Sequence, residues 1–288
     1  MTTKKQAKRG ILISVVGLIL MVLGVLWLAF IFPALDKVPT DYTNTYYFDG
    51  AFQLFTAQGN LTIPIAQELA QEATGTEDGA LLIHEVRTVK NAVTGDPLPA
   101  NYQDESTLAI DRRTLEFVTD VDERGRTGQW GPPRPLGEGD SFELWNPGAL
   151  KPLTANYLRS EDFRDLGVVV FEINQDYIDI PEDPQMGMDL YFKTRITLWI
   201  EPSSGTVVNQ TSETTTAIDM GVMKVPVQIS NVNYAERTIE DLMDTARSAR
   251  WALLWFRTIV PWLFIGVGAI LVIIDTLILS RRRGVQAR

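Results

Sequence analysis

The sequence predicts a mostly β domain of two related antiparallel lobes with a minor helix, placed between N- and C-terminal transmembrane helices. Three observations favour this class. Apolar runs of 22 residues lie near both ends of the 288-residue chain. Short runs of β-branched and alternating residues, separated by turn residues, fill the middle. An amphipathic stretch without Gly or Pro leads into the second apolar run.

The two apolar runs are residues 11–32, which contain no charge, and residues 258–279, which contain only Asp275. Each meets the roughly 20 residues that a helix needs to cross a bilayer. The first run is too long for the apolar part of a cleaved signal peptide, and no small-x-small cleavage site precedes Phe32 and Pro33. We therefore expect an uncleaved anchor at residues 11–32 and a second transmembrane helix at residues 258–279.

The charges predict the orientation in the membrane. Residues 1–10 and 280–288 are basic tails, and basic flanks stay in the cytoplasm, so we expect both termini inside and the middle of the chain outside the plasma membrane. Residues 33–257 contain 18 basic and 35 acidic residues, which disfavours nucleic-acid binding. An acidic domain is repelled by an anionic leaflet, so the helices must be the contact with the lipid bilayer.

Two features of the apolar runs each have two interpretations. Ser14, Gly17, Met21 and Gly24 share one helical face, which either admits a partner helix closely or reflects the frequency of Gly in membrane helices. Asp275 is either an intramembrane functional carboxylate or, as we favour, a side chain that reaches the interface beside the arginine cluster.

Residues 235–257 predict an amphipathic juxtamembrane helix that packs an apolar stripe on the β domain. Acidic and basic residues, from Glu236 to Arg247, occupy the opposite face. We expect Pro261, just inside the second run, to bend the helix. The stripe consists of Ile239, Leu242, Ala246, Ala249, Leu253 and Phe256.

Residues 34–234 predict the β-rich extracytoplasmic domain. Ile63 to Thr74 is the one helix candidate within it, since Ile65, Leu69 and Ala73 recur at intervals of four. Gly128 to Gly139 is the clearest loop. The expected strands lie in residues 80–89, 107–110, 115–119, 167–173, 191–200, 206–211 and 225–232.

A repeat at an offset of 90 residues suggests the two lobes. Thr107 to Asp111 matches Thr197 to Glu201, and each segment is followed by a short polar turn and a returning strand. We predict hairpins at residues 106–118 and 196–208, in equivalent places of lobes at about 40–130 and 140–234. Asp111 and Glu201 are then expected to face solvent where the turns begin.

The layout resembles the porin PorA family of actinobacterial two-anchor membrane proteins, a domain of unknown function. The matching pieces are the basic start with the anchor ending in residues 32–39, Ser106 to Phe117 around Asp111 to Thr114, Thr194 to Asn209, and Ala246 to Arg250. Many members carry a cysteine pair where this chain has residues 117–120, so the resemblance implies no disulfide role here. A porin needs a closed membrane barrel or a helix bundle around water, which two helices do not form in a monomer.

The sequence predicts no enzyme and no catalytic, cofactor or metal residues. The chain has no cysteine, and His84, its one histidine, lies in a strand pattern without a partner motif. Residues 120–125 begin like a calcium loop but place Arg124 at the fifth ligand position and no Glu at the twelfth. The acidic cluster at residues 176–183, made of Asp176, Asp179, Glu182 and Asp183, is either a solvated turn or a loose calcium site.

Two functions remain open. One is the binding or transfer of lipid or another hydrophobic ligand in the cell envelope, which requires an enclosed apolar cavity. The other is a structural or accessory subunit with a membrane-protein partner or a second copy of the chain, which requires an exposed apolar patch on a solid core. The residues expected to supply the cavity include Val168, Val170, Tyr191, Leu198, Ile200, Val207, Val225 and Val227.

Overall fold

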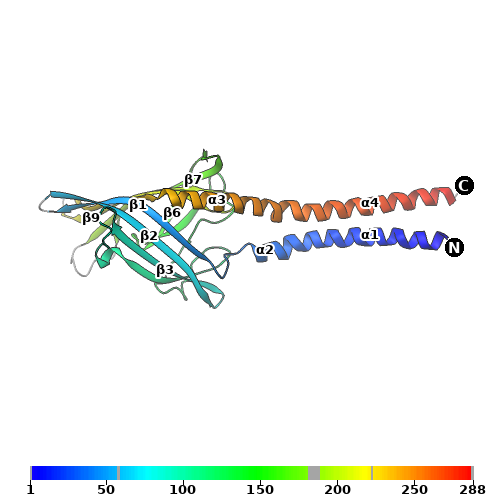
Figure 1. Ribbon diagram of the computed structural model, residues 1–288, viewed down its shortest axis with the longest axis horizontal. Coiled ribbons are helices and arrows are strands. Elements are labelled where there is room, and N and C mark those ends of the chain that lie inside the picture. Colours follow the sequence, from blue (N-terminus) through cyan, green and yellow to red (C-terminus); the bar gives the residue numbers. More distant parts are fainter. Residues whose placement is uncertain (1, 57–58, 181–188, 222, 287–288) are drawn as a thin grey trace. The chain divides into compact units, whose positions relative to one another are not determined.

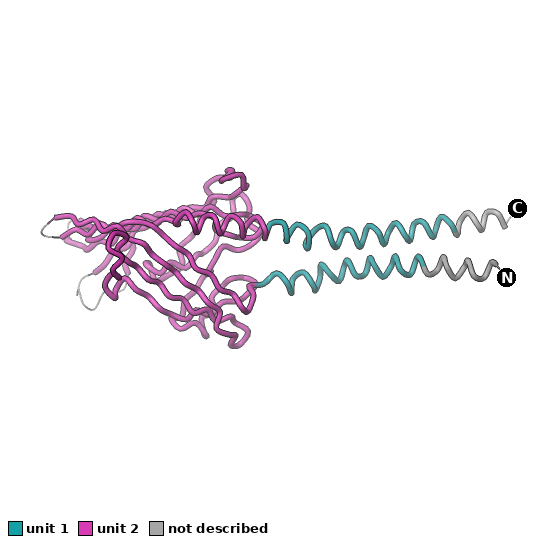
Figure 2. The backbone as a smooth tube through the Cα atoms, viewed as in Figure 1, with its two compact units in different colours: residues 1–37, 250–288 teal, residues 38–249 magenta. Residues whose placement is uncertain are grey.

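A computed structural model describes residues 2–56, 59–180, 189–221 and 223–286. The chain divides into two compact units, which are coloured separately in Figure 2. One unit contains residues 1–37 and 250–288 and is helical. The other contains residues 38–249 and holds every strand of the described chain.

The helical unit consists of two helices, each long and apolar enough to cross a membrane (Figure 1). Each helix contains a short π-helical segment near a proline, Pro33 or Pro261. Because proline has no N–H, it removes one hydrogen bond from the helix, and the irregularity expected at Pro261 takes the form of a π segment before it. The elements are α1 (Thr2–Leu26), η1 (Trp27–Ile31), α2 (Phe32–Leu35), η3 (Leu254–Ile259) and α4 (Val260–Gln286).

The two helices lie side by side (Figure 2), and glycines form their contact. A Cβ atom added to Gly17 would lie 2.6 Å from the carbonyl oxygen of Gly268, and one added to Gly24 would lie 2.7 Å from Ile265 Cγ1. The small-residue face of Ser14, Gly17 and Gly24 therefore admits a partner helix, and the partner is the second helix of the same chain. The first of the two interpretations of this face is confirmed.

The second unit is built on one antiparallel sheet of ten strands in the order β4-β3-β2-β1-β10-β9-β8-β7-β6-β5. The strands are β1 (Thr43–Thr56), β2 (Gly59–Glu77), β3 (Ala80–Asn91), β4 (Asp104–Ile110), β5 (Ser141–Asn146), β6 (Lys151–Phe163), β7 (Leu166–Ile180), β8 (Leu190–Ile200), β9 (Val207–Asp219) and β10 (Lys224–Tyr234). The remaining elements are the 3₁₀ turn η2 (Ala100–Tyr102) and the helix α3 (Glu236–Leu253).

The edge strands β4 and β5 are joined by backbone hydrogen bonds through the intervening loop, at residues 115–118 and 128–130. Residues 115–118 bond to β4, residues 128–130 bond to β5, and the two segments bond to each other, so the sheet closes into a barrel. The links are Val118 N to Ala109 O at 2.9 Å, Phe117 N to Gly128 O at 3.0 Å, Gln129 N to Glu143 O at 2.8 Å and Trp145 N to Gln129 O at 2.9 Å.

The helix α3 covers part of the outer face of this sheet. Its apolar side is buried against β7 and β9, with Ile239, Met243 and Ala246 in one cluster with Val170 and Val208. The hydroxyl of Thr238 accepts a hydrogen bond from Tyr47 N at 2.7 Å and donates one to Tyr47 O at 3.0 Å. The amphipathic stripe is confirmed over this part of the helix, while Phe256 lies in the other unit and is exposed.

The helix expected at Ile63 to Thr74 is wrong, because these residues lie in strand β2. An interval of four is also an even interval, so Ile65, Leu69 and Ala73 share one face of a strand as well as one face of a helix. Residues 63–72 of the segment are paired with β1, for example Ile65 with Gly50, and this pairing holds the segment as a strand.

The repeat is visible in the turns but not as two separate lobes, because β1 pairs with β10 and makes one sheet of both halves. Asp111 N donates to Glu116 O at 2.8 Å, and 90 residues later Glu201 N donates to Thr206 O at 2.9 Å. Leu115 and Gly205 both have positive φ. The expectation that Glu201 faces solvent is wrong: it is 1% exposed, and its carboxylate accepts a hydrogen bond from Ser204 N at 2.7 Å.

Candidate ligand-binding interior

The strands separate an inner and an outer face of the barrel. Alternate residues point to opposite faces, and along β8 the inward residues are buried while those between them are not. The same face carries buried side chains of β3, β4 and β7, such as Ile83, Leu108 and Phe171. The inward residues of β8 are Leu190, Phe192, Thr194, Ile196, Leu198 and Ile200.

The apolar residues expected to line a cavity do not share one. Leu198 and Ile200 face inward, whereas Val168 and Val170 face outward beneath α3. Val170 is paired with the outward Trp199 of β8, and Val168 has the same parity as Val170, so a list drawn from apolar composition mixed the two faces. The expectation of one cavity lined by all of them is therefore wrong.

The interior is filled unevenly. Beside β5 to β8 it is a solid apolar core in which Phe171, Ile173 and Leu198 are fully buried. Beside β9 and β10 the inward side chains are mostly small or polar and half-buried, whereas on β1 and β2 half-buried residues alternate with the buried Phe48, Phe52 and Ile65. The half-buried inward residues there include Ile63, Gln67, Leu69, Ser212, Thr214, Thr216, Gln228 and Ser230.

A hydrogen-bonded chain of polar side chains crosses the inner face at β1, β2 and β3. Tyr42 Oη lies 3.2 Å from Tyr46 Oη and donates to Gln71 Oε1 at 3.1 Å, and Gln71 Nε2 donates to Glu85 Oε2 at 2.6 Å. Tyr234 stacks on Tyr46 with ring centroids 6.1 Å apart. Burial raises the pKa of each of these three tyrosines, so their hydroxyls stay protonated at neutral pH.

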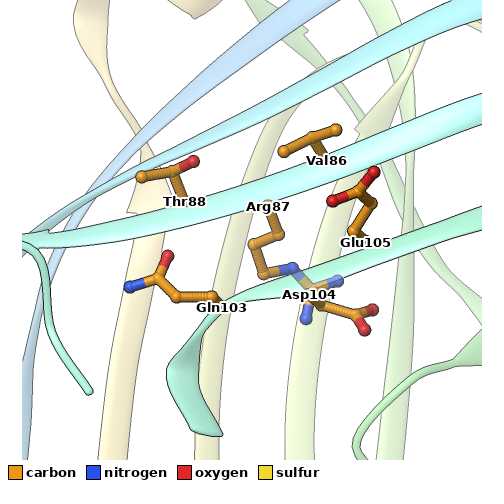
Figure 3. Close-up of a pocket in the computed structure, with 6 residues that line it drawn as sticks. All are labelled: Val86, Arg87, Thr88, Gln103, Asp104 and Glu105. Carbon is orange, nitrogen blue, oxygen red and sulfur yellow. The ribbon is translucent and has the colours of Figure 1, made fainter. Parts of the chain in front are cut away.

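An open pocket of about 380 Å³, which we call the cavity beside Arg87, lies between β3 and the start of β4, lined by Val86, Arg87, Thr88, Gln103, Asp104 and Glu105 (Figure 3). At this point the pairing of β3 is completed by a side chain: Gln103 Oε1 accepts from Val89 N, and Gln103 Nε2 donates to Val89 O, both at 2.9 Å. The backbone ladder between β3 and β4 begins only at Arg87 and Asp104. The cavity therefore lies where the barrel wall is interrupted.

Arg87 is the notable charge of this cavity. Its inward position is fixed by its place opposite Leu69 and Asp104, and Figure 3 shows its side chain extending from β3 towards Asp104. Nε of Arg87 is buried and has no hydrogen-bond partner within the described residues. A buried donor without a partner costs about 1–3 kcal/mol, so its retention calls for an explanation.

Asp104 is already held by another arginine. Arg124 donates to both carboxylate oxygens of Asp104, at 2.7 and 3.1 Å. Burial raises the pKa of Asp104, but the hydrogen bonds and charge of Arg124, with the charge of Arg87, outweigh it and lower the pKa overall. Sequence reasoning missed Arg87, although a signal existed: Arg87 shares the parity of the apolar Leu81, Ile83 and Val89.

The other candidates from the sequence have structural partners. His84 lies on the outer face of β3 with Nε2 3.4 Å from Glu105 Oε1. In the calcium-like segment, Asp122 is buried and accepts hydrogen bonds from Arg126 Nη1 at 2.8 Å and from Arg126 N at 2.9 Å. Arg126 Nη2 donates to Ser106 Oγ at 2.6 Å, so these residues tie the closing loop to β4.

The acidic cluster at residues 176–183 is described only in part. Asp176 lies 3.2 Å from Lys193 Nζ, while Glu182 and Asp183 lie outside the described residues. Among the residues that are described, no group of three or more His, Cys, Asp or Glu is arranged to hold a metal ion.

Comparison with known proteins assigns the chain to a family. The family described as Porin PorA matches residues 10–277, nearly the whole chain. The chain belongs to the porin PorA family. No curated protein matches this PorA-family chain.

Two solved structures resemble it weakly. Rv2717c from M. tuberculosis is 11% identical with a TM-score of 0.32, and the similarity covers 66% of this chain and 92% of that one. A Vibrio parahaemolyticus domain described as an outer membrane lipoprotein-sorting protein is 10% identical with a TM-score of 0.17, over 71% of this chain and 88% of the other. At these TM-scores neither similarity says what the PorA-family chain does.

The geometry of the strands disagrees with a pore made by this barrel. A transmembrane barrel needs an apolar outer band, and charged residues facing lipid are costly. The outward residues in the middle of this PorA-family sheet include Lys193, Arg195 and Glu213, all exposed. The barrel is therefore built to have water, not lipid, on this face.

Asp275, in the second apolar helix, does not reach the interface as we favoured. It is 1% exposed, and its Oδ2 accepts a hydrogen bond from Ser14 Oγ on α1. Its Oδ1 is buried without a partner within the described residues. The carboxylate lies four residues from the end of the predicted span but bonds to the neighbouring helix and not to water, because the glycine contacts bring that helix close enough.

Proposed function

We propose that this protein is a non-enzymatic, membrane-anchored carrier that binds a lipid or another hydrophobic ligand inside the barrel of residues 38–249. The observation that carries the proposal is the uneven filling of the interior. The part beside β5 to β8 is a solid core, whereas the inward residues of β9 and β10, most of them hydroxyl-bearing or polar, are half-buried, next to the apolar cluster of Phe52, Ile65 and Val89. A small amphipathic molecule fits such an interior better than water does, because it covers the apolar surface.

The ligand would be exchanged at a membrane. The two apolar helices anchor the protein in the plasma membrane, with basic tails at residues 1–10 and 280–288 in the cytoplasm and the barrel outside. A carrier fixed by both ends receives its ligand from the adjacent bilayer and passes it outward. The acidic balance of the barrel keeps it from adsorbing on an anionic leaflet.

A second candidate function is supported by a different observation. Leu61, Met220 and Met223 are 53%, 62% and 67% exposed and lie at the ends of the β1–β2 and β9–β10 hairpins. Exposed apolar residues of this kind are typical of protein–protein contacts. The alternative is that the protein is an accessory subunit of a membrane complex, or a homo-oligomer, that docks through these hairpin ends.

The carrier proposal is tested by filling the part of the barrel beside β9 and β10. Ser230 faces inward opposite Phe52 and Thr214, and its neighbour Asn231 faces outward and is exposed. In the full-length protein purified in a mild detergent, we expect Ser230→Trp to abolish copurification of lipid detected by native mass spectrometry. Asn231→Trp, the same change on the other face, should leave lipid binding intact.

The outcomes separate the two candidates. Wild-type protein that carries no lipid and binds no fluorescent fatty acid would contradict the carrier. If that lipid-free protein copurifies with a stoichiometric membrane partner, and the changes Met220→Ser and Met223→Ser release this partner, the result supports the subunit alternative.

A further inference from the structure

We infer that Arg87 binds the negatively charged head group, a carboxylate or a phosphate, of an amphipathic ligand whose apolar chain lies along the inner wall of the barrel. This inference rests on the proposed carrier function and names the class of its ligand. It begins from the buried Nε of Arg87, which lacks a hydrogen-bond partner among the described residues.

Every neighbouring acidic side chain has a partner other than Arg87. Asp104 is bonded by Arg124 at 2.7 and 3.1 Å, Glu85 accepts a hydrogen bond from Gln71 at 2.6 Å, and Glu105 lies 3.4 Å from His84. In the described part of the chain, no carboxylate forms an ion pair with Arg87. The guanidinium is therefore the uncommitted cation of this region.

The guanidinium also borders enough space for a head group. The cavity of about 380 Å³ beside Arg87 opens where Gln103 replaces the backbone of β4 as the partner of β3 (Figure 3). Thr88 adds a hydroxyl group to its lining, while the amide of Gln103 is hydrogen-bonded to the backbone of Val89 and Leu98. Arginine presents its N–H groups in a fixed fork that matches carboxylate and phosphate oxygens, which makes it the usual residue for such groups.

An apolar cluster leads away from Arg87. Val89, two positions along the same face of β3, is buried with Ile65 and Phe52, and Ile63, Leu98, Tyr102 and Val232 pack against these three residues. This cluster leads from β3 across β2 and β1 to β10, where the half-buried inward residues begin. A ligand with its anionic end at Arg87 would thus take the place of the covering Leu98 and Tyr102 side chains and extend its chain towards β10.

The test compares ligands that differ only in charge, using the full-length protein in a mild detergent. Oleic acid is compared with oleyl alcohol, and oleoyl lysophosphatidic acid with monoolein, by native mass spectrometry. We expect the wild-type protein to prefer the anion of at least one pair by about 10- to 100-fold, the size of a charge-assisted hydrogen bond in a partly buried site. The pair that shows the preference identifies the head group as a carboxylate or a phosphate.

Variants then assign the preference to one side chain. Arg87→Met should remove the preference for the anion and leave the uncharged ligand bound as before. Arg87→Lys keeps the charge and should retain part of the preference for the anion. It also replaces Arg87→Met in the test if that variant does not fold. The control is Arg195→Met, because Arg195 is exposed on the outer face and pairs with Glu172 at 2.7 Å.

The failures are distinguishable. If wild-type protein binds charged and uncharged ligands equally, or Arg87→Met weakens both alike, the head-group inference is overturned and the carrier function stands. If none of the four ligands binds, or if Ser230→Trp leaves all binding unchanged, the carrier function fails and takes the inference with it.

Discussion

Ser14 on α1 donates a hydrogen bond to the carboxylate of Asp275 on α4, across 261 positions of the sequence. The contact lies within the helical unit, where it joins the two helices at a polar point in otherwise apolar surroundings. Polar contacts of this kind hold membrane helices together, because an unpaired polar group in hydrocarbon is costly.

The first prediction concerns this pair. Ser14→Ala removes the donor and leaves both carboxylate oxygens without a partner, so we expect the helix pair to lose about 0.5–2 kcal/mol of stability. Asp275→Asn keeps an acceptor for Ser14 and should be milder. The double variant Ser14→Ala with Asp275→Leu replaces both polar groups and should recover the loss. Thermal unfolding in detergent measures all three, and an unchanged midpoint for Ser14→Ala would contradict the role of the contact.

The second prediction concerns the glycines of the same helix pair. A Cβ atom on Gly268 would collide with the backbone of Gly17 and with Met21, whereas one on Gly266 meets nothing within 4 Å. Gly268→Leu should therefore force the helices apart and cost about 1–3 kcal/mol. Gly266→Leu, two positions away, is the matched control and should be tolerated. Equal effects of the two changes on thermal unfolding would show that close helix packing is not required.

The helical unit could be predicted well because its signals are local. Two apolar runs, the first without a charge and the second with only Asp275, indicated the helices, and the face of Ser14, Gly17 and Gly24 indicated their contact. The prediction for Asp275 was wrong. Its distance from the end of the apolar run can be read from the sequence, whereas its distance from Ser14 in the other helix cannot.

The barrel was less predictable because its decisive contacts are not local. Residues 115–118 and 128–130 close the ring with isolated backbone hydrogen bonds. The sequence indicated a strand at residues 115–119, where the structure has only isolated bridges, and a loop at residues 128–139. Inner and outer faces could not be assigned either, because register shifts such as the one between Gln175 and Ile178 change the parity along a strand.

The third prediction separates the two equivalent turns of the repeat. Glu201 is buried and accepts a hydrogen bond from Ser204 N, while Asp111 is exposed and accepts from Arg113 N and Thr114 N. Glu201→Ala should lower the free energy of unfolding by about 1–3 kcal/mol, because it leaves a buried N–H unpaired. Asp111→Ala should cost at most about 1 kcal/mol, because water replaces the lost acceptor. Denaturant titration gives both values, and a larger effect at Asp111 would contradict this reading of the turns.

The last prediction is the topology, for which the chain offers a clean background because it has no cysteine. Single cysteines are placed by Thr3→Cys and Gln286→Cys in the two basic tails and by Glu213→Cys on the exposed outer face of β9. In intact cells, a membrane-impermeant maleimide should label only the cysteine at position 213. After permeabilisation, all three should react.

The physical reason is the distribution of charge, so the same experiment can test it. The tails hold eight basic residues and no acidic one, and short basic flanks are retained in the cytoplasm. Replacing Lys4, Lys5, Lys8 and Arg9 with Gln should make the cysteine at position 3 partly accessible from outside, while the cysteine at position 286 stays protected by Arg281, Arg282 and Arg283. Labelling of position 3 or position 286 in intact cells with the natural tails would reverse the orientation and place the barrel in the cytoplasm.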